Sequence, residues 1–368
     1  MIIDSKAPTR IDLAGGTIDI WPIYLLNSQL NAPALTINLG INLYAQAQLE
    51  ITDTPAGQKP SITLQSHDQH AETRLTWDEL EKRVDSLPPS LILSGKLISY
   101  FTRKTEPAHA ADLRLKTSAQ SPAGAGLGGS STLAIAMLGA LSSWAESKTV
   151  NPLTDGENLI EIARDIETTL IRVPAGLQDY YGAMYGGLQK LAWGVAKHTR
   201  KYLPQTLIPE LEKRILLFYS GQSRNSGINN WALYKSFIDG DPSVRAMFRS
   251  ISQATQELES AFENLTAASS SNWSAVNDAI AAEWAARKGL AAGISTPEMD
   301  QAFKIAEQEG RCAGKICGAG GGGCFFVFEP TGDQKKADFL RGKIAAIPGI
   351  RPLPFQGVSG GLQIQVSA

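Results

Sequence analysis

The chain has 368 residues and a formal net charge of −2, with 43% hydrophobic and 19% charged residues. This length exceeds what one hydrophobic core usually organises, so we expect two domains of an ordinary globular protein. The absence of a run of like charges argues against a nucleic-acid or acidic-lipid surface as the main partner. No uninterrupted apolar stretch approaches the length of a membrane span.

The predicted elements mix strands and helices along the whole chain. Residues 7–19 predict a strand that ends in a glycine turn, and apolar–polar alternation predicts strands at 34–52, 61–65 and 112–117. The remaining predicted elements are helices over 131–146 and 158–171, a strand over 212–220, helices over 242–267, 273–289 and 296–308, and strands over 324–328 and 362–366. Because they lack the strict alternation of a doubly wound sheet, we predict an α+β fold. We place the domains at residues 1–190 and 191–368.

A glycine-rich segment at residues 121–131 lies between a predicted strand and a predicted helix. Four glycines in eleven residues exceed what a tight turn needs, and serines of a type that caps helices follow them. Free N–H groups and a partial positive charge at a helix start suit an anion, so we predict a phosphate cradle for a nucleotide. The residues assigned to it are Pro122, Gly124, Ala125, Gly126, Leu127, Gly128, Gly129, Ser130 and Ser131.

Two better-known nucleotide loops fit this segment poorly. The Walker pattern GxxxxGK[ST] is absent. The spacing GxGxxG is present at Gly124, Gly126 and Gly129, but a dinucleotide fold needs a second strand that ends in an acidic residue about twenty positions later. Since residues 158–171 predict a helix instead, a nicotinamide site is the weaker interpretation.

A second glycine-rich segment, residues 317–324, follows the order helix, loop, strand. Its glycines, among them Gly320 and Gly321, indicate a close backbone approach to a ligand or to another loop. The three cysteines, Cys312, Cys317 and Cys324, all fall near it without a CxxC pair, so we expect buried thiols and not a zinc site. Their small, odd number is typical of a reducing cytoplasm.

Four charged residues are candidates for phosphoryl-transfer chemistry. Glu167 lies on the predicted amphipathic helix, and Asp179 follows a Val-Pro-Ala-Gly break in the chain. A magnesium ion that bridges the phosphates of ATP takes one or two oxygen ligands from the protein. Phosphoryl transfer also needs a group that orients or deprotonates the attacking hydroxyl of the acceptor. Arg10 could neutralise the transferred phosphoryl group or hold a carboxylate, and Asp19 could accept hydrogen bonds from a polyol. Solvated carboxylates and surface ion pairs are the plain alternatives.

Together these segments resemble the GHMP kinase superfamily, named for galacto-, homoserine, mevalonate and phosphomevalonate kinases. The resemblance rests on three motifs in the family's order: residues 7–19, residues 122–131 and residues 318–323. It spans nearly the whole chain. It implies an N-terminal α+β domain and a ferredoxin-like C-terminal domain, with the active site between them.

The resemblance also implies roles for the candidate residues. Ser131, with Ser130 as the alternative, and Glu167 would hold Mg²⁺, Asp179 would orient or deprotonate the acceptor hydroxyl, and Arg10 would assist it. Asp19 would bind the acceptor; we assign Thr17, Gly320 and Gly321 to the same substrate site.

The segments 14–19 and 178–187 look more like the sugar-kinase branch, such as heptose-phosphate and fucose kinases, than like mevalonate or galactose kinases. Thr17, Ile18 and Gly129 differ from the sequence pattern of that branch, and this leaves the exact sugar open. The expected activity is transfer of a phosphate from ATP, with Mg²⁺, to a hydroxyl of a sugar or sugar phosphate. The alternatives are a mevalonate-pathway kinase or decarboxylase on the same fold, and a non-catalytic sugar or nucleotide sensor. We expect a cytoplasmic enzyme without a signal peptide, without nucleic-acid or membrane partners, and with a homodimer as its candidate assembly.

Overall fold

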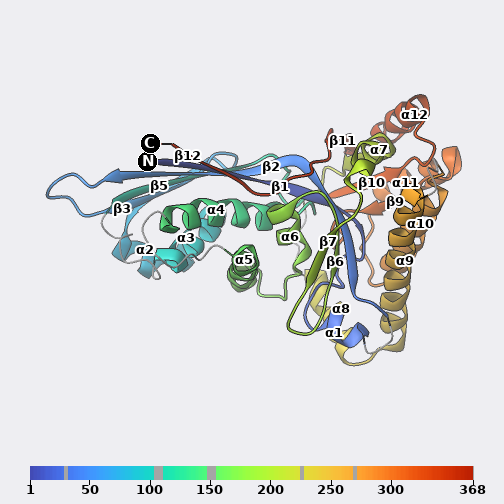
Figure 1. The fold of residues 1–368 in the computed structure, drawn as a ribbon, viewed down its shortest axis with the longest axis horizontal. Coiled ribbons are helices and arrows are strands. Elements are labelled where there is room, and N and C mark those ends of the chain that lie inside the picture. Colours follow the sequence, from blue (N-terminus) through green and yellow to red (C-terminus); the bar gives the residue numbers. More distant parts are fainter. Residues whose placement is uncertain (29–31, 103–110, 147–154, 224–227, 268–271, 368) are drawn as a thin grey trace.

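The computed structural model describes residues 1–28, 32–102, 111–146, 155–223, 228–267 and 272–367. These residues form two sheets, one at each end of an elongated molecule (Figure 1). Both sheets carry helices, and only one strand pair of the first sheet, β3 with β5, is parallel. The α+β prediction is therefore confirmed.

The first sheet is built around the long strand β2. Its main path has the order β12-β1-β2-β5-β3-β4, and the strands β6 and β7 branch from β2. The strands are β1 (Ile2–Ala14), β2 (Leu35–Asp53), β3 (Ser61–Ser66), β4 (Ala71–Thr76), β5 (Ala111–Ala119), β6 (Leu188–Ala192), β7 (Thr199–Tyr202) and β12 (Gln363–Ser367). The alternation that predicted strands over 34–52 thus belongs to one strand of 19 residues.

Helices cover one face of this sheet (Figure 1). They are α2 (Trp77–Arg83), the short 3₁₀ helix at 84–86, α3 (Pro89–Thr102), α4 (Gly129–Glu146), α5 (Gly156–Ile171) and α6 (Gln178–Tyr185). The apolar composition of α4 is explained by its position, because residues 134–138 are fully buried against β1 and β2. A short helix, α1 (Ile23–Ser28), follows the turn after β1.

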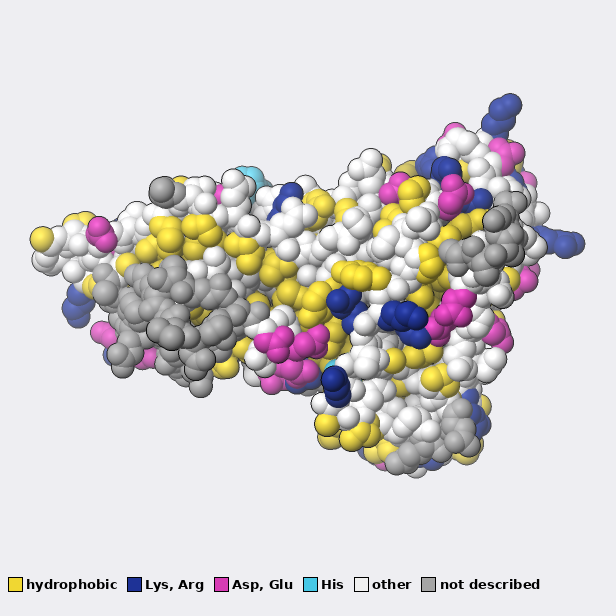
Figure 2. Space-filling view, in the orientation of Figure 1, with side chains coloured by type: hydrophobic (Ala, Val, Ile, Leu, Met, Phe, Trp, Pro, Cys, Tyr) yellow, Lys and Arg dark blue, Asp and Glu magenta, His cyan; other side chains and the backbone are white. Residues whose placement is uncertain are grey.

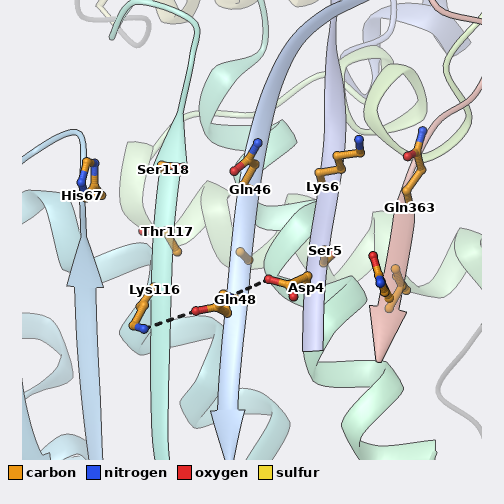
Figure 3. A pocket seen from close by; sticks show the side chains of 13 residues that line it. Asp4, Ser5, Lys6, Gln46, Gln48, His67, Lys116, Thr117, Ser118 and Gln363 are labelled. Carbon is orange, nitrogen blue, oxygen red and sulfur yellow. Dashed lines mark hydrogen bonds between the residues drawn. The ribbon is translucent and has the colours of Figure 1, made fainter. Parts of the chain in front are cut away.

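The opposite face of the first sheet carries polar side chains (Figure 3). Gln48 donates to Asp4 at 2.8 Å and accepts from Lys116 at 3.3 Å, across a shallow hollow of about 490 Å³. His67 lies exposed at its rim. Over residues 45–50 of β2 buried positions alternate with more exposed ones, so the sequence pattern correctly identifies a half-buried strand there, whereas residues 35–41 are buried throughout.

The second sheet has the order β11-β8-β10-β9 and is antiparallel throughout. In chain order these strands are the fourth, first, third and second of the domain, which is the ferredoxin-like arrangement that the family resemblance implied. The elements are β8 (Ile215–Tyr219), α8 (Ile228–Ile238), α9 (Pro242–Ala267), α10 (Ser274–Lys288), α11 (Pro297–Gly310), β9 (Ala313–Ile316), β10 (Cys324–Phe328), α12 (Gln334–Ala345) and β11 (Arg351–Pro352).

The predicted strand over 212–220 is wrong in its first part. A 3₁₀ turn at 205–207 leads into helix α7 (Ile208–Arg214), and the strand β8 begins only at Ile215. The helix is favoured by Pro209 in its first turn and by basic residues in its last turn, Lys213 and Arg214. The apolar run from Ile215 alone forms the strand.

The chain crosses between the two sheets more than once. Strands β6 and β7 extend the first sheet as far as Tyr202, and β12 returns from the second domain to pair with β1, with Ile2 opposite Ser367. The division at residue 190 stays a prediction. Within the described stretches, no helix is both long and apolar enough to cross a membrane.

Candidate active site

The first glycine-rich segment forms a tight loop between β5 and α4. Gly124, Gly126 and Gly128 all have positive φ angles, of 67°, 75° and 76°, a conformation that other residue types adopt at a cost. Helix α4 begins at Gly129, so Ser130 and Ser131 lie in its first turn and are not its caps. The loop therefore presents the free N–H groups of a helix start, as a phosphate cradle requires.

The second glycine-rich segment packs directly on the first. A Cβ atom added to Gly318 would lie 2.8 Å from the Cα atom of Gly126, so neither loop has room for a side chain there. The N–H of Cys324 donates to the carbonyl of Ala125 at 2.6 Å. The close approach expected of this segment is thus to another loop.

Gly320 and Gly321 lie against Ile294, on the segment between α10 and α11. The N–H of Gly321 donates to the carbonyl of Ile294 at 2.8 Å, and a Cβ atom on Gly320 would lie 2.4 Å from the same oxygen. These contacts give both glycines a structural partner within the chain. Their assignment to the substrate site stays a prediction.

Arg10, near the end of β1, joins Asp179 to both glycine loops. Its Nε donates to Oδ1 of Asp179 at 2.8 Å, while Nη1 donates to the carbonyls of Gly126 at 2.8 Å and Cys317 at 2.9 Å. Burial acts to lower the pKa of Arg10, but the carboxylates of Asp179 and Asp12 outweigh it and hold the pKa above its usual value. Arg10 is therefore a fixed cation at the junction of the loops.

Asp179 lies in the first turn of α6, beside Gly128. A Cβ atom added to Gly128 would lie 3.0 Å from Cβ and Cγ of Asp179. The Asp179 side chain keeps 26% of its surface exposed, whereas that of Arg10 keeps 4%. The carboxylate is thus held from behind by Arg10 and remains accessible at the edge of the loop.

Glu167, on α5, receives hydrogen bonds from both candidate serines. The hydroxyl of Ser131 donates to Oε2 at 2.9 Å, and the hydroxyls of Ser130 and Tyr180 also donate to this carboxylate. Burial raises the pKa of Glu167, and these three hydroxyl groups partly offset that effect. Among the described residues no cation pairs with Glu167, so three neutral donors surround a buried carboxylate. Such a cluster of carboxylate and hydroxyl oxygens matches the ligands that Mg²⁺ prefers.

Asp19 ends the turn that follows β1 and is 2% exposed. Its Oδ2 accepts the N–H of Gln178 at 2.9 Å, so it lies next to Asp179 in space. Burial, together with the charges of Asp179 and Asp12, raises its pKa to about 7. The sequence-predicted residues Arg10, Asp179, Glu167, Ser131 and Asp19 are thus brought together.

Four buried charged side chains lie behind the turn that follows β1, and they were not identified from the sequence. Lys315 of β9 contacts Oδ2 of Asp12 at 3.2 Å and Oε1 of Glu283 at 3.1 Å. Arg287, one turn after Glu283 on α10, donates to Glu283 at 2.7 Å and to the carbonyl of Gly16 at 2.7 Å. All four side chains are 2% exposed or less.

The pKa of Glu283 reflects these ion pairs. Burial would raise the pKa of Glu283, but Arg287 and Lys315 hold it below its usual value. A signal for this group was present in the sequence, because Asp12 and Lys315 each interrupt an apolar strand, which buried charges do only when they are paired. We refer to Asp12, Glu283, Arg287 and Lys315 as the interdomain charge cluster.

The three cysteines are free and buried, as expected. Burial raises the pKa of Cys317 to about 12 and that of Cys312 to about 11, so both remain thiols at neutral pH.

Comparisons with known proteins agree with this geometry. The family models described as "GHMP kinases N terminal domain" and "GHMP kinases C terminal" match residues 93–187 and 242–342. The chain is 25% identical over 340 residues to D-glycero-alpha-D-manno-heptose 7-phosphate kinase of Campylobacter jejuni, covering 89% of this chain and 90% of that protein. It is 28% identical to L-fucokinase/L-fucose-1-P guanylyltransferase of Bacteroides fragilis, over 89% of this chain and 34% of that longer protein.

Solved structures share the fold across the whole chain. The D-glycero-D-manno-heptose 1-phosphate kinase of Bacteroides thetaiotaomicron matches with a TM-score of 0.69 and 20% identity, covering 100% of this chain and 99% of that one. Galactokinase of Lactococcus lactis matches with a TM-score of 0.72 and 14% identity, over 99% and 95% of the two chains. The two matched domain models, the fold and the paired glycine loops lead to one conclusion: the chain belongs to the GHMP kinase superfamily.

Proposed function

We propose that this protein transfers the γ-phosphate of ATP to a hydroxyl group of a sugar or a sugar phosphate. The observation that carries this proposal is the position of Arg10, whose guanidinium binds Asp179 and the carbonyls of Gly126 and Cys317 together. A candidate base is thereby fixed at the edge of a candidate phosphate cradle. The sugar class is supported by the heptose-phosphate kinase and fucokinase relatives.

Asp179 is the proposed base. It accepts the proton of the acceptor hydroxyl as that oxygen bonds to the γ-phosphorus, while the bond from this phosphorus to the leaving ADP oxygen breaks. Arg10 orients Asp179 by pairing with Oδ1. The amide groups at the start of α4 would hold the phosphates in place, and positioning of this kind accounts for much of the rate enhancement in phosphoryl transfer.

Glu167, Ser131 and Ser130 are the proposed magnesium ligands. Mg²⁺ at this position would neutralise charge on the phosphate oxygens. Glu167 supplies the carboxylate, and the serine hydroxyls that now donate to it can turn their oxygens toward the metal. Because both serines contact Glu167, the structure leaves both as candidate ligands.

Asp19 and Thr17 are the proposed contacts to the acceptor. Asp19 lies one hydrogen bond away from the backbone of Gln178 and so beside the proposed base. With a pKa of about 7 it can both accept from and donate to sugar hydroxyls near neutral pH.

The test is an ADP-release screen with MgATP over hexoses, heptoses, their phosphates and mevalonate. We expect ADP release with at least one sugar or sugar phosphate and none with mevalonate. Turnover with mevalonate alone would replace this proposal with a mevalonate-pathway activity. Tight binding of a sugar without ADP release over hours would show a sensor instead.

A further inference from the structure

A cavity of about 490 Å³ lies directly beside Asp19, between the end of α5 and the segment that follows β1. Figure 2 shows the surface hollowed between α5 and the lobe that carries α1 and α8. The cavity is lined by Asp19, Trp21, Tyr24, five residues between 164 and 173, and Pro174, Ala175 and Leu177. Because Asp19 lines the cavity and also contacts the backbone next to Asp179, the cavity adjoins the proposed transfer site. It is therefore placed to hold the part of the acceptor that does not react.

Helix α5 presents two neighbouring stripes of side chains. Glu167 points toward the serines of α4, whereas Arg164, Thr168 and Arg172, spaced four residues apart, line the cavity. Arg164 is already bound to Glu161 and to Asp165, whose Oδ1 lies 2.7 Å from Nη2. Its charge is thus largely neutralised within the protein.

Arg172 is different. Among the residues that the structure describes, no group forms a hydrogen bond or ion pair with its guanidinium. Its backbone caps α5 in the left-handed conformation, with φ at 57°, and its N–H donates to the carbonyl of Thr168. Glycine or asparagine occupies such a position at lower cost, and a basic side chain is favourable at a helix C-terminus, as at Arg311 after α11. Arg172 lines the cavity, and its guanidinium carries five N–H donors.

The rest of the cavity suits a sugar. Trp21 keeps 60% of its surface exposed, and the indole of an exposed tryptophan offers a flat apolar face for the C–H groups of a sugar ring. Acidic side chains gather over α5 (Figure 2), and Asp165 and Asp19 both line the cavity. Because the surrounding surface is acidic, the positive charge that would bind an anion here comes from the guanidinium of Arg172.

From these observations we infer that the acceptor is a phosphorylated sugar whose existing phosphate binds to Arg172 while its ring lies over Trp21. This inference rests on the proposed function and names the acceptor class of the same site. The planar guanidinium of an arginine can donate hydrogen bonds to two phosphate oxygens at once, whereas the ammonium group of a lysine does not form this bidentate contact. Phosphate recognition here is separate from the glycine-loop cradle, which would hold the nucleotide.

The experiment compares binding and turnover of sugar phosphates with those of their parent sugars. Affinities for mannose 6-phosphate, sedoheptulose 7-phosphate, the two parent sugars and glucuronic acid are measured calorimetrically without nucleotide, and ADP release is measured with it. The variants are Arg172→Asn, which tolerates the left-handed backbone, and Arg172→Lys, which keeps the charge. Arg83→Gln, on α2 at the far end of the first domain, is the matched control.

For the wild type we expect at least about tenfold tighter binding and a lower KM for one phosphorylated sugar than for its parent. Arg172→Asn should remove this preference, Arg172→Lys should keep part of it, and Arg83→Gln should leave it unchanged. Equal affinity for the parent sugar, a preference that survives Arg172→Asn, or tighter Arg172-dependent binding of glucuronic acid would each overturn the inference.

The two proposals fail in different ways. ADP release without any effect of Arg172→Asn on the phosphate preference would refute this site and leave the kinase activity standing. Arg172-dependent binding of a sugar phosphate without ADP release would support the site and refute the kinase activity. If no sugar phosphate binds to the wild type, the inference is wrong.

Discussion

The Nη1 atom of Arg287, on a helix of the second domain, donates to the hydroxyl of Thr17 at 3.1 Å. Thr17 belongs to the turn that leads to Asp19, and its φ of 71° is rare for a β-branched residue. The same arginine also binds the carbonyl of Gly16. The turn that shapes the proposed acceptor site is therefore held in place by the other domain.

The interdomain charge cluster should be essential for stability. Lys315→Met leaves the buried carboxylates of Asp12 and Glu283 with one cation fewer, and we expect a loss of about 3–5 kcal/mol in the free energy of unfolding. Lys304→Met, at an exposed position of α11, should change it by less than about 0.5 kcal/mol. Urea unfolding monitored by circular dichroism measures both. Equal losses in the two variants would contradict the role of the cluster.

Asp179→Asn tests the proposed base. The amide keeps the shape of the carboxylate and an oxygen for Arg10, so we expect normal folding and ATP affinity. Turnover should fall about 10²- to 10⁴-fold because the variant cannot accept the proton. A coupled assay for ADP measures turnover, and fluorescence titration with a nucleotide analogue measures affinity. Near-normal turnover would remove Asp179 from the catalytic role.

Glu167→Gln separates metal binding from stability. Because burial already raises the pKa of Glu167, a neutral amide should leave the Tm unchanged or slightly higher. The Mg²⁺ concentration needed for half-maximal turnover should rise at least about tenfold, because the carboxylate ligand is lost. Glu257→Gln, at an exposed position on α9, is the control and should alter neither quantity. An unchanged Mg²⁺ requirement would argue against Glu167 as a ligand.

Gly128→Ala should disturb Asp179 directly. Both Gly128, at a φ of 76°, and Gly57, at 81°, lie in the left-handed region, so alanine is strained at either position. Only at Gly128 does the added Cβ meet Asp179, at 3.0 Å, while nothing lies within 4 Å of one at Gly57. We expect similar losses of Tm in Gly128→Ala and Gly57→Ala, but a loss of kcat only in the former. Equal kcat values would show that this contact does not position Asp179.

Asp19 should make stability depend on pH. Its pKa of about 7 in the folded protein exceeds the ordinary value of 3.8, so the folded state binds more protons between these limits. The free energy of unfolding should therefore fall as the pH rises from about 4 to 7, by at most about 4 kcal/mol from this group. Asp19→Asn lacks this titration, and its advantage over the wild type should grow across that window. Parallel pH profiles from urea unfolding would exclude the effect.

The sequence was most informative where one residue type dominates a segment. The glycine loops and the apolar helix α4 were predictable because glycine content and apolar periodicity report local backbone and burial directly. Arg10, Asp179 and Glu167 were candidates by residue type and by motif, but their shared geometry depends on strands and helices far apart in the chain.

Other features depend on tertiary contacts that local pattern does not encode. Asp12 and Lys315 are separated by about three hundred residues, and no spacing rule links a strand of one domain to a strand of the other. The helix α7 was missed because its charged residues adjoin the apolar run of β8, and the change from a helical to a strand period occurs within a few residues. The cavity beside Asp19 likewise depends on how α1 packs near α5.

The pairing of β12 with β1 has a consequence for how the protein can be engineered. Ile2 lies opposite Ser367, so the two chain ends emerge side by side at one edge of the first sheet (Figure 1). A short peptide could join them into a ring, and new ends could then be opened in an exposed loop such as the one around Gly57. The ferredoxin-like domain is thus inserted in the chain between strands that all belong to the first sheet, with β7 before it and β12 after it.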